Sequence, residues 1–95
     1  MHALDALGNP LRREILQTLS QTPLAVGELA GRFPVSRPAI SRHLRVLEEA
    51  GLVEPRSRGA SSVYAVRAQG LASVRDFLDE FWEAALLRLE ELAEE

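Results

Sequence analysis

Some features that often decide a protein's class are missing from this 95-residue chain. It has no cysteine, which excludes disulfides, thiolate metal ligands and cysteine nucleophiles. No apolar run approaches the roughly 18 residues that cross a bilayer, and Met1-His2-Ala3 does not begin a signal peptide. We therefore expect a cytoplasmic protein with no part in the membrane and no thiol chemistry.

The composition that remains is typical of a folded domain. Hydrophobic residues make up 46% of the chain and charged residues 26%, well away from the range of disordered proteins. A chain this short has enough interior for one core and gains from burying more surface in a partner. We expect residues 1–95 to form a single domain that associates with a second copy.

The charge is unevenly distributed, although the net charge is only -3. Residues 32–67 hold seven arginines against three acidic residues, a balance of +4. Residues 68–95 hold two arginines against eight acidic residues, a balance of -6. A polyanion could therefore bind the middle of the chain while the acidic end stays away from it.

Apolar spacing and capping residues predict a mostly α-helical fold with one small β-hairpin. Asn9 and Ser36 are candidate N-caps, Pro10 and Pro38 fit a first helical turn, and Gly51 fits a left-handed stop. Glycine and β-branched residues after position 51 indicate a hairpin in which Pro55 places the first strand at an edge. The predicted elements are five helices at 2–7, 10–20, 26–32, 37–50 and 70–94, and a hairpin at 52–67.

The helix predicted at 37–50 carries most of the functional argument. Ile40, Leu44 and Leu47 form an apolar stripe, with His43 at its border. The opposite side has hydroxyl and guanidinium donors and no acid before Glu48, and such donors bond guanine edges and phosphate. A short helix, a tight turn and a longer helix with this basic side predict a helix-turn-helix. The candidate DNA-binding residues here are Ser36, Arg37, Pro38, Ser41, Arg42, His43 and Arg45.

The hairpin extends this motif into a winged helix-turn-helix. Its turn carries Arg56, Arg58 and Gly59. The two guanidinium groups could reach backbone phosphate or a neighbouring minor groove. Double-stranded DNA is thus the predicted partner.

The last predicted helix has more apolar surface than a small domain can cover. Apolar residues recur along it at steps of three and four, so we interpret one side as a dimer seam, anchored by Phe81 and Trp82. The candidate interface residues are Leu4, Leu7, Leu71, Val74, Leu78, Phe81, Trp82, Ala85 and Leu89.

Three segments carry a resemblance to a known family: 8–16, 26–30 and, most specifically, 36–53. Over almost its full length the chain resembles the ArsR/SmtB family of winged-helix repressors. The resemblance implies a homodimer packed through its first and last helices that binds a two-fold-symmetric operator and blocks transcription. It also implies base or phosphate contacts from Arg37, Pro38, Ser41 and Arg42.

The chain departs from the metal-sensing members of that family. Ala25-Val26-Gly27 stands where the thiolate-sensing branch has Cys-Val-Cys, and residues 70–95 contain carboxylates but no histidine. Carboxylates alone make a poor zinc or nickel site. The sequence therefore resembles the metal-independent branch, with no cofactor and no identified effector.

Two other interpretations remain open at this point. The acidic overall charge leaves room for a winged-helix module that binds a partner protein instead of DNA. His43 could be a half-buried structural residue. An enzyme is not expected, because the acidic cluster of Asp76, Asp79, Glu80 and Glu83 has no nucleophile or basic partner beside it.

Overall fold

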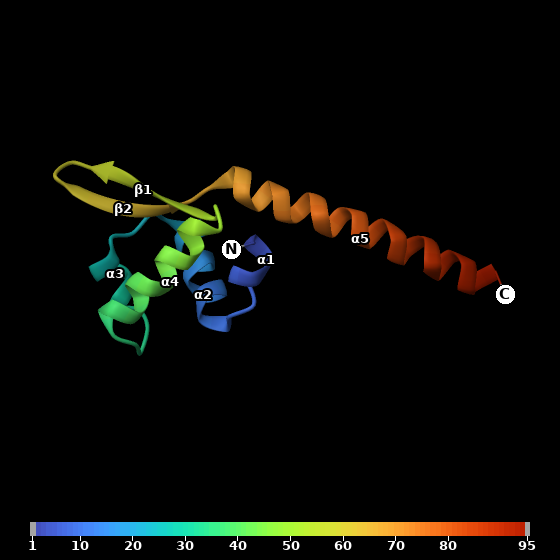
Figure 1. Ribbon diagram of the computed structural model, residues 1–95, viewed down its shortest axis with the longest axis horizontal. Coiled ribbons are helices and arrows are strands. Elements are labelled where there is room, and N and C mark those ends of the chain that lie inside the picture. Colours follow the sequence, from blue (N-terminus) through green and yellow to red (C-terminus); the bar gives the residue numbers. More distant parts are fainter. Residues whose placement is uncertain (1, 95) are drawn as a thin grey trace.

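A computed structural model of the protein describes residues 2–94. Five helices and one hairpin follow in the predicted order, which confirms the winged helix-turn-helix (Figure 1). The boundaries agree within two residues, the third helix ending early at Ala30 and the fifth beginning early at Ala68. The elements are α1 Ala3–Ala6, α2 Pro10–Gln21, α3 Val26–Ala30, α4 Arg37–Glu49, β1 Val53–Arg58, β2 Ser61–Val66 and α5 Ala68–Glu94.

The N-terminal ends of α2 and α4 are capped as their sequences predict. The Asn9 side chain accepts hydrogen bonds from the backbone N–H groups of Leu11 and Arg12, at 2.9 and 3.1 Å. The Ser36 hydroxyl accepts from Ala39 N–H at 3.3 Å. These bonds satisfy backbone donors that have no partner within the helix, so each helix starts at a defined residue.

Helix α4 ends in a Schellman motif centred on Gly51. Leu52 N–H donates to the Leu47 carbonyl and Gly51 N–H to the Glu48 carbonyl, both at 2.9 Å. The motif requires a left-handed residue, and Gly51 has φ of +76°. The chain therefore turns sharply out of α4 and enters β1 two residues later.

The hairpin is antiparallel, with Val53 opposite Val66 and Arg58 opposite Ser61. Gly59 supplies the positive φ, +61°, that the first position of a two-residue type II′ turn requires. On its other side β2 pairs with Leu24, whose N–H and C=O both bond Tyr64. This bridge was not predicted; it leaves β1 at the edge, where Pro55, which has no N–H to donate, is tolerated.

One core holds α1 to α4, the hairpin and the start of α5 together. Its largest fully buried side chains come from α2, α3, α4, the turn after α4 and the first residue of β1: Ile15, Leu29, Ile40, Leu44, Leu47, Leu52 and Val53. The predicted apolar stripe of α4 therefore lies at the centre of the core.

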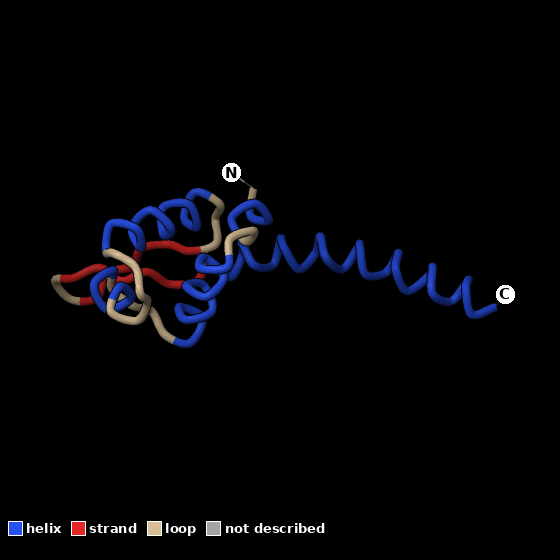
Figure 2. Tube along the Cα trace, turned by 90° about the horizontal axis from the view of Figure 1, so that it is seen from below, coloured by secondary structure: helices blue, strands red, loops and turns tan. Residues whose placement is uncertain are grey.

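Helix α5 leaves this body after its first two turns. Of its 27 residues only Gly70 and Val74 are buried, and the rest of the helix projects away (Figures 1 and 2). This projection gives the chain its elongated dimensions of 62 × 26 × 23 Å. No helix within residues 2–94 combines the length and the apolar character needed to cross a membrane.

The close approach of α5 to the α4–β1 turn depends on Gly70. A Cβ built on Gly70 would overlap the carbonyl oxygen of Gly51, whereas one built on Gly27 would make only an ordinary contact, 3.6 Å from Arg37 Nη1. The start of α5 is therefore held against the body by a backbone contact that no other residue type allows.

We expect Gly70→Ala to lower the free energy of unfolding by about 1–3 kcal/mol, because backbone atoms must move to accept the methyl group. Gly27→Ala is the matched control and should raise it by about 0.5–1 kcal/mol, the usual gain for alanine in a helix. Urea unfolding followed by circular dichroism measures both. A stabilised Gly70→Ala variant would show that the contact is not tight.

Candidate nucleic-acid interface

The outer side of α4 presents the predicted basic residues to solvent. Arg37, Arg42 and Arg45 are exposed, as are Ser36 and Pro38, while Ser41 is half-buried at the edge of the helix. The opposite side is anchored by Ile40, Leu44 and Leu47, each at most 1% exposed. Because the stripe is completely buried, α4 cannot rotate about its axis, and its guanidinium groups remain on the surface.

The first turn of α4 lies against α3. The Arg37 guanidinium passes beside Gly27, with Nη1 3.6 Å from the position that a Cβ would occupy there. The Ser36 hydroxyl uses its oxygen for the cap, and its own hydrogen remains available to donate. Both side chains are therefore oriented in part by the fold.

His43 lies at the border between the core and the exposed arginines. It is half-buried. Burial lowers its pKa from the ordinary value of 6.5, and the nearby guanidinium groups of Arg12 and Arg42 lower it further. The imidazole is therefore harder to protonate than that of a free histidine, and its position fits a structural residue as well as a DNA contact.

The two wing arginines, predicted to reach phosphate or a minor groove, both contact carboxylates in the structure. Arg56 Nη2 lies 3.0 Å from Glu54 Oε1 within β1. Arg58 Nη2 lies 2.8 Å from Glu28 Oε1 on α3. Sequence reasoning missed the second pair because its members are 30 residues apart. The sequence around Glu28, which is the only charged residue between Glu14 and Arg32, gave no sign of this contact.

The predicted dimer residues fall into two groups. Those beyond the body are exposed: Leu78 by 51%, Phe81 by 70%, Trp82 by 64% and Leu89 by 61%, with Ala85 also exposed. Leu4, Leu7 and Leu71 are half-buried against the core. Val74 was placed in the seam by its spacing, but it is 9% exposed and belongs to the core of its own subunit.

The exposed apolar surface of α5 is larger than the predicted seam. Phe77 is 46% exposed and its ring stacks on that of Phe81 at a centroid distance of 6.4 Å. Leu86, Leu87 and Leu92 are exposed by 43%, 60% and 50%. Apolar side chains thus run along most of the projecting helix.

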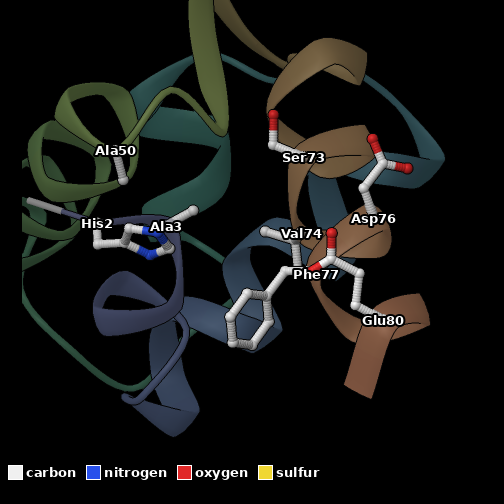
Figure 3. Close-up of a pocket in the computed structure, with 8 residues that line it drawn as sticks. All are labelled: His2, Ala3, Ala50, Ser73, Val74, Asp76, Phe77 and Glu80. Atoms are coloured by element: carbon white, nitrogen blue, oxygen red, sulfur yellow. The ribbon is translucent and has the colours of Figure 1, made fainter. Parts of the chain in front are cut away.

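An open hollow lies where α1, the end of α4 and the start of α5 meet. Figure 3 shows His2 and Ala3 on one side of it and Val74 and Phe77 on the other. Ala50, Ser73, Asp76 and Glu80 complete its lining. Among residues 2–94 there is no group of three or more His, Asp or Glu side chains placed to hold a metal ion.

Comparison with known proteins agrees with this geometry. Residues 7–56 match the family described as a helix-turn-helix domain. Over 84 residues the chain is 51% identical to the HTH-type transcriptional regulator Rv2034 of Mycobacterium tuberculosis, covering 88% of this chain and 78% of the relative.

Two solved structures are similar over most of the chain. The ArsR-like transcriptional regulator from Rhodococcus sp. RHA1 is 32% identical with a TM-score of 0.77, covering 95% of this chain and 88% of that one. The homodimeric winged helix-turn-helix domain of Mb0332 from Mycobacterium bovis, a possible ArsR-family regulator, is 27% identical with a TM-score of 0.68, covering 85% and 75%.

The family match covers α2, α3, α4 and the first part of β1, and the structural matches extend over 85–95% of the chain. These proteins are transcriptional regulators, and none of their names describes an enzyme. The chain belongs to the ArsR family of winged helix-turn-helix, DNA-binding transcriptional regulators.

Proposed function

We propose that this regulator is a homodimeric repressor whose two α4 helices enter successive major grooves of a two-fold-symmetric operator. The observation that carries the proposal is the complete burial of one side of α4, which leaves Arg37, Arg42 and Arg45 exposed on the other. Arginine bonds the O6 and N7 atoms of guanine with two donors at once, so these residues suit sequence reading.

Position along α4 suggests how the contacts divide. Arg42 and Ser41 lie one turn inside the helix, where base edges come within reach. Ser36, Arg37 and Pro38 lie at its start, close to the flanking phosphates, and Arg45 lies one turn further along. Glu48 and Glu49 at the far end would be repelled by phosphate, which favours entry by the N-terminal half of α4.

The wing adds a second contact region. Arg56, Arg58 and Gly59 are exposed on the hairpin, whose tip extends past α3 (Figure 1). We assign them to backbone phosphate, which is contacted whatever the base sequence. His43 is a weaker candidate for a DNA contact, because its ring is half-buried.

A second copy of this chain is the proposed cover for the apolar side of α5. Transferring one large apolar side chain from water contributes about 1.5–3 kcal/mol, and the predicted seam holds four exposed ones: Leu78, Phe81, Trp82 and Leu89. The homodimeric neighbour from M. bovis supports the same assembly. Residues 1–95 then form one domain, and the seam combines α5 with the half-buried Leu4 and Leu7 of α1.

Repression would follow when the dimer occupies its operator. Two α4 helices roughly 34 Å apart on one side of the duplex cover about two helical turns of a promoter. Such a complex would exclude polymerase without a metal or any other cofactor. The absence of cysteine and of histidine on α5 favours the metal-independent form of this mechanism.

We expect Arg42→Ala to weaken binding to a selected operator by about 1–3 kcal/mol, while binding to mixed-sequence DNA changes little. Arg75→Ala is the matched control, since it removes the same charge from an exposed position on α5. Fluorescence anisotropy measures both.

Wild-type affinity should fall by roughly three to five decades between 50 and 200 mM salt if about six to ten phosphates are contacted. A flat salt response, or an equal loss in both variants, would contradict DNA reading by α4.

We expect the wild type to sediment as a dimer at micromolar concentration and Phe81→Glu to sediment as a monomer, because the charge would be buried in an apolar seam. Leu87→Glu is the control, since Leu87 is also exposed, by 60%, but lies about 120° around the helix from Phe81 and is not one of the predicted seam residues. Analytical ultracentrifugation distinguishes the two forms. A monomeric wild type, or dissociation by both variants, would exclude the proposed seam.

A further inference from the structure

The contact between Glu28 and Arg58 is unlike the other ion pairs in residues 2–94. The other three join side chains at most three positions apart in the sequence. Glu28 and Arg58 are 30 positions apart and connect the start of α3 to the tip of the wing. This ion pair therefore constrains where the wing arginine lies in the DNA-free protein.

The Glu28 carboxylate is also held in place by a backbone group at the start of α3. The same oxygen that meets Arg58 also accepts a hydrogen bond from Ala25 N–H at 3.0 Å. This bond is the carboxylate half of a capping box, since Ala25 has no side-chain acceptor to complete it. The Ala25 bond is the main cause of a lowered Glu28 pKa, and the Arg58 bond adds to it, so the group is ionised at neutral pH.

Another anion can replace Glu28 as the partner of Arg58. The Arg58 and Glu28 side chains are 55% and 45% exposed, so solvent and large anions can reach both. Exposed pairs of this kind are weak. Nothing lies within 4 Å of a Cβ built on Gly59, so the neighbouring turn is not packed against the body.

Carboxylate and phosphate are equivalent partners for a guanidinium group, because each offers anionic oxygens at the same hydrogen-bond distance. A phosphate that approaches Arg58 must either displace Glu28 or accept repulsion from its charge. Arg56 differs, because its partner Glu54 lies on the same strand and moves with it.

We propose that Glu28 competes with DNA phosphate for Arg58 and thereby weakens binding to every DNA sequence. Glu28 is a positioning residue: it holds the wing arginine on α3 until a phosphate takes its place. The competition makes the wing contact less favourable on any duplex, so stable binding depends more on the base contacts of α4. This inference rests on the proposed DNA-binding function and on the wing's part in it.

The test uses the full chain and a fluorescent 30-base-pair duplex of mixed sequence at low salt, because phosphate contacts need no particular sequence. Glu28→Gln keeps an oxygen for Ala25 N–H and removes the charge. We expect it to tighten binding about two- to five-fold, the range of an exposed ion pair. In the Arg58→Ala background the same substitution should change nothing. Glu14→Gln makes the same charge change at an exposed position on α2. It should leave the affinity within about 1.5-fold of wild type, because salt screens distant charges.

Three results would overturn the proposal: unchanged or weaker binding by Glu28→Gln, an equal gain in the Arg58→Ala background, or an equal gain from Glu14→Gln. Glu28→Ala, which also loses the cap, must show the same dependence on Arg58; circular dichroism confirms that each variant is folded. If the wild type itself binds no duplex, the proposed function fails and this inference fails with it, which separates that outcome from the other three.

Discussion

The structure depends on the burial of one side of α4. Ile40, Leu44 and Leu47 pack into the centre of the core, where rotating the helix would expose apolar surface and bury guanidinium groups without partners. The Ser36 cap and the Gly51 motif fix where the helix begins and ends. A rigid, basic outer side results from this packing, and it is the surface that we propose meets DNA.

Electrostatics then separates the two ends of the molecule. The basic residues gather on α4 and the wing, whereas the acidic excess lies on α5, which projects away from them (Figure 1). A net charge of -3 is therefore compatible with a polyanionic partner. Within the basic region, Glu28 partly neutralises the wing arginine it contacts. The proposed cover for the apolar side of α5 is a second copy of the chain, which would bring a second α4 with it.

Local patterns predicted most of this fold, and non-local contacts account for what they missed. The stripe of α4, the Asn9 and Ser36 caps and the Gly51 stop depend on residues within one or two turns, so spacing alone revealed them. The Leu24–Tyr64 bridge and the Glu28–Arg58 pair join residues 30 or more positions apart, and no periodicity encodes them. Val74 follows the apolar spacing of α5, yet spacing does not show where a helix leaves its own core. The interface assignments on α4, the wing and α5 stay predictions.

The central claim is that two outward-facing α4 helices, related by a two-fold axis, read DNA. Selection of bound duplexes from a random-sequence pool tests it most directly. The account predicts an enriched inverted repeat with half-site centres about 10 base pairs apart, the spacing of successive major grooves on one side of the duplex. Enrichment of an unrepeated site, or no enrichment at all, would contradict it.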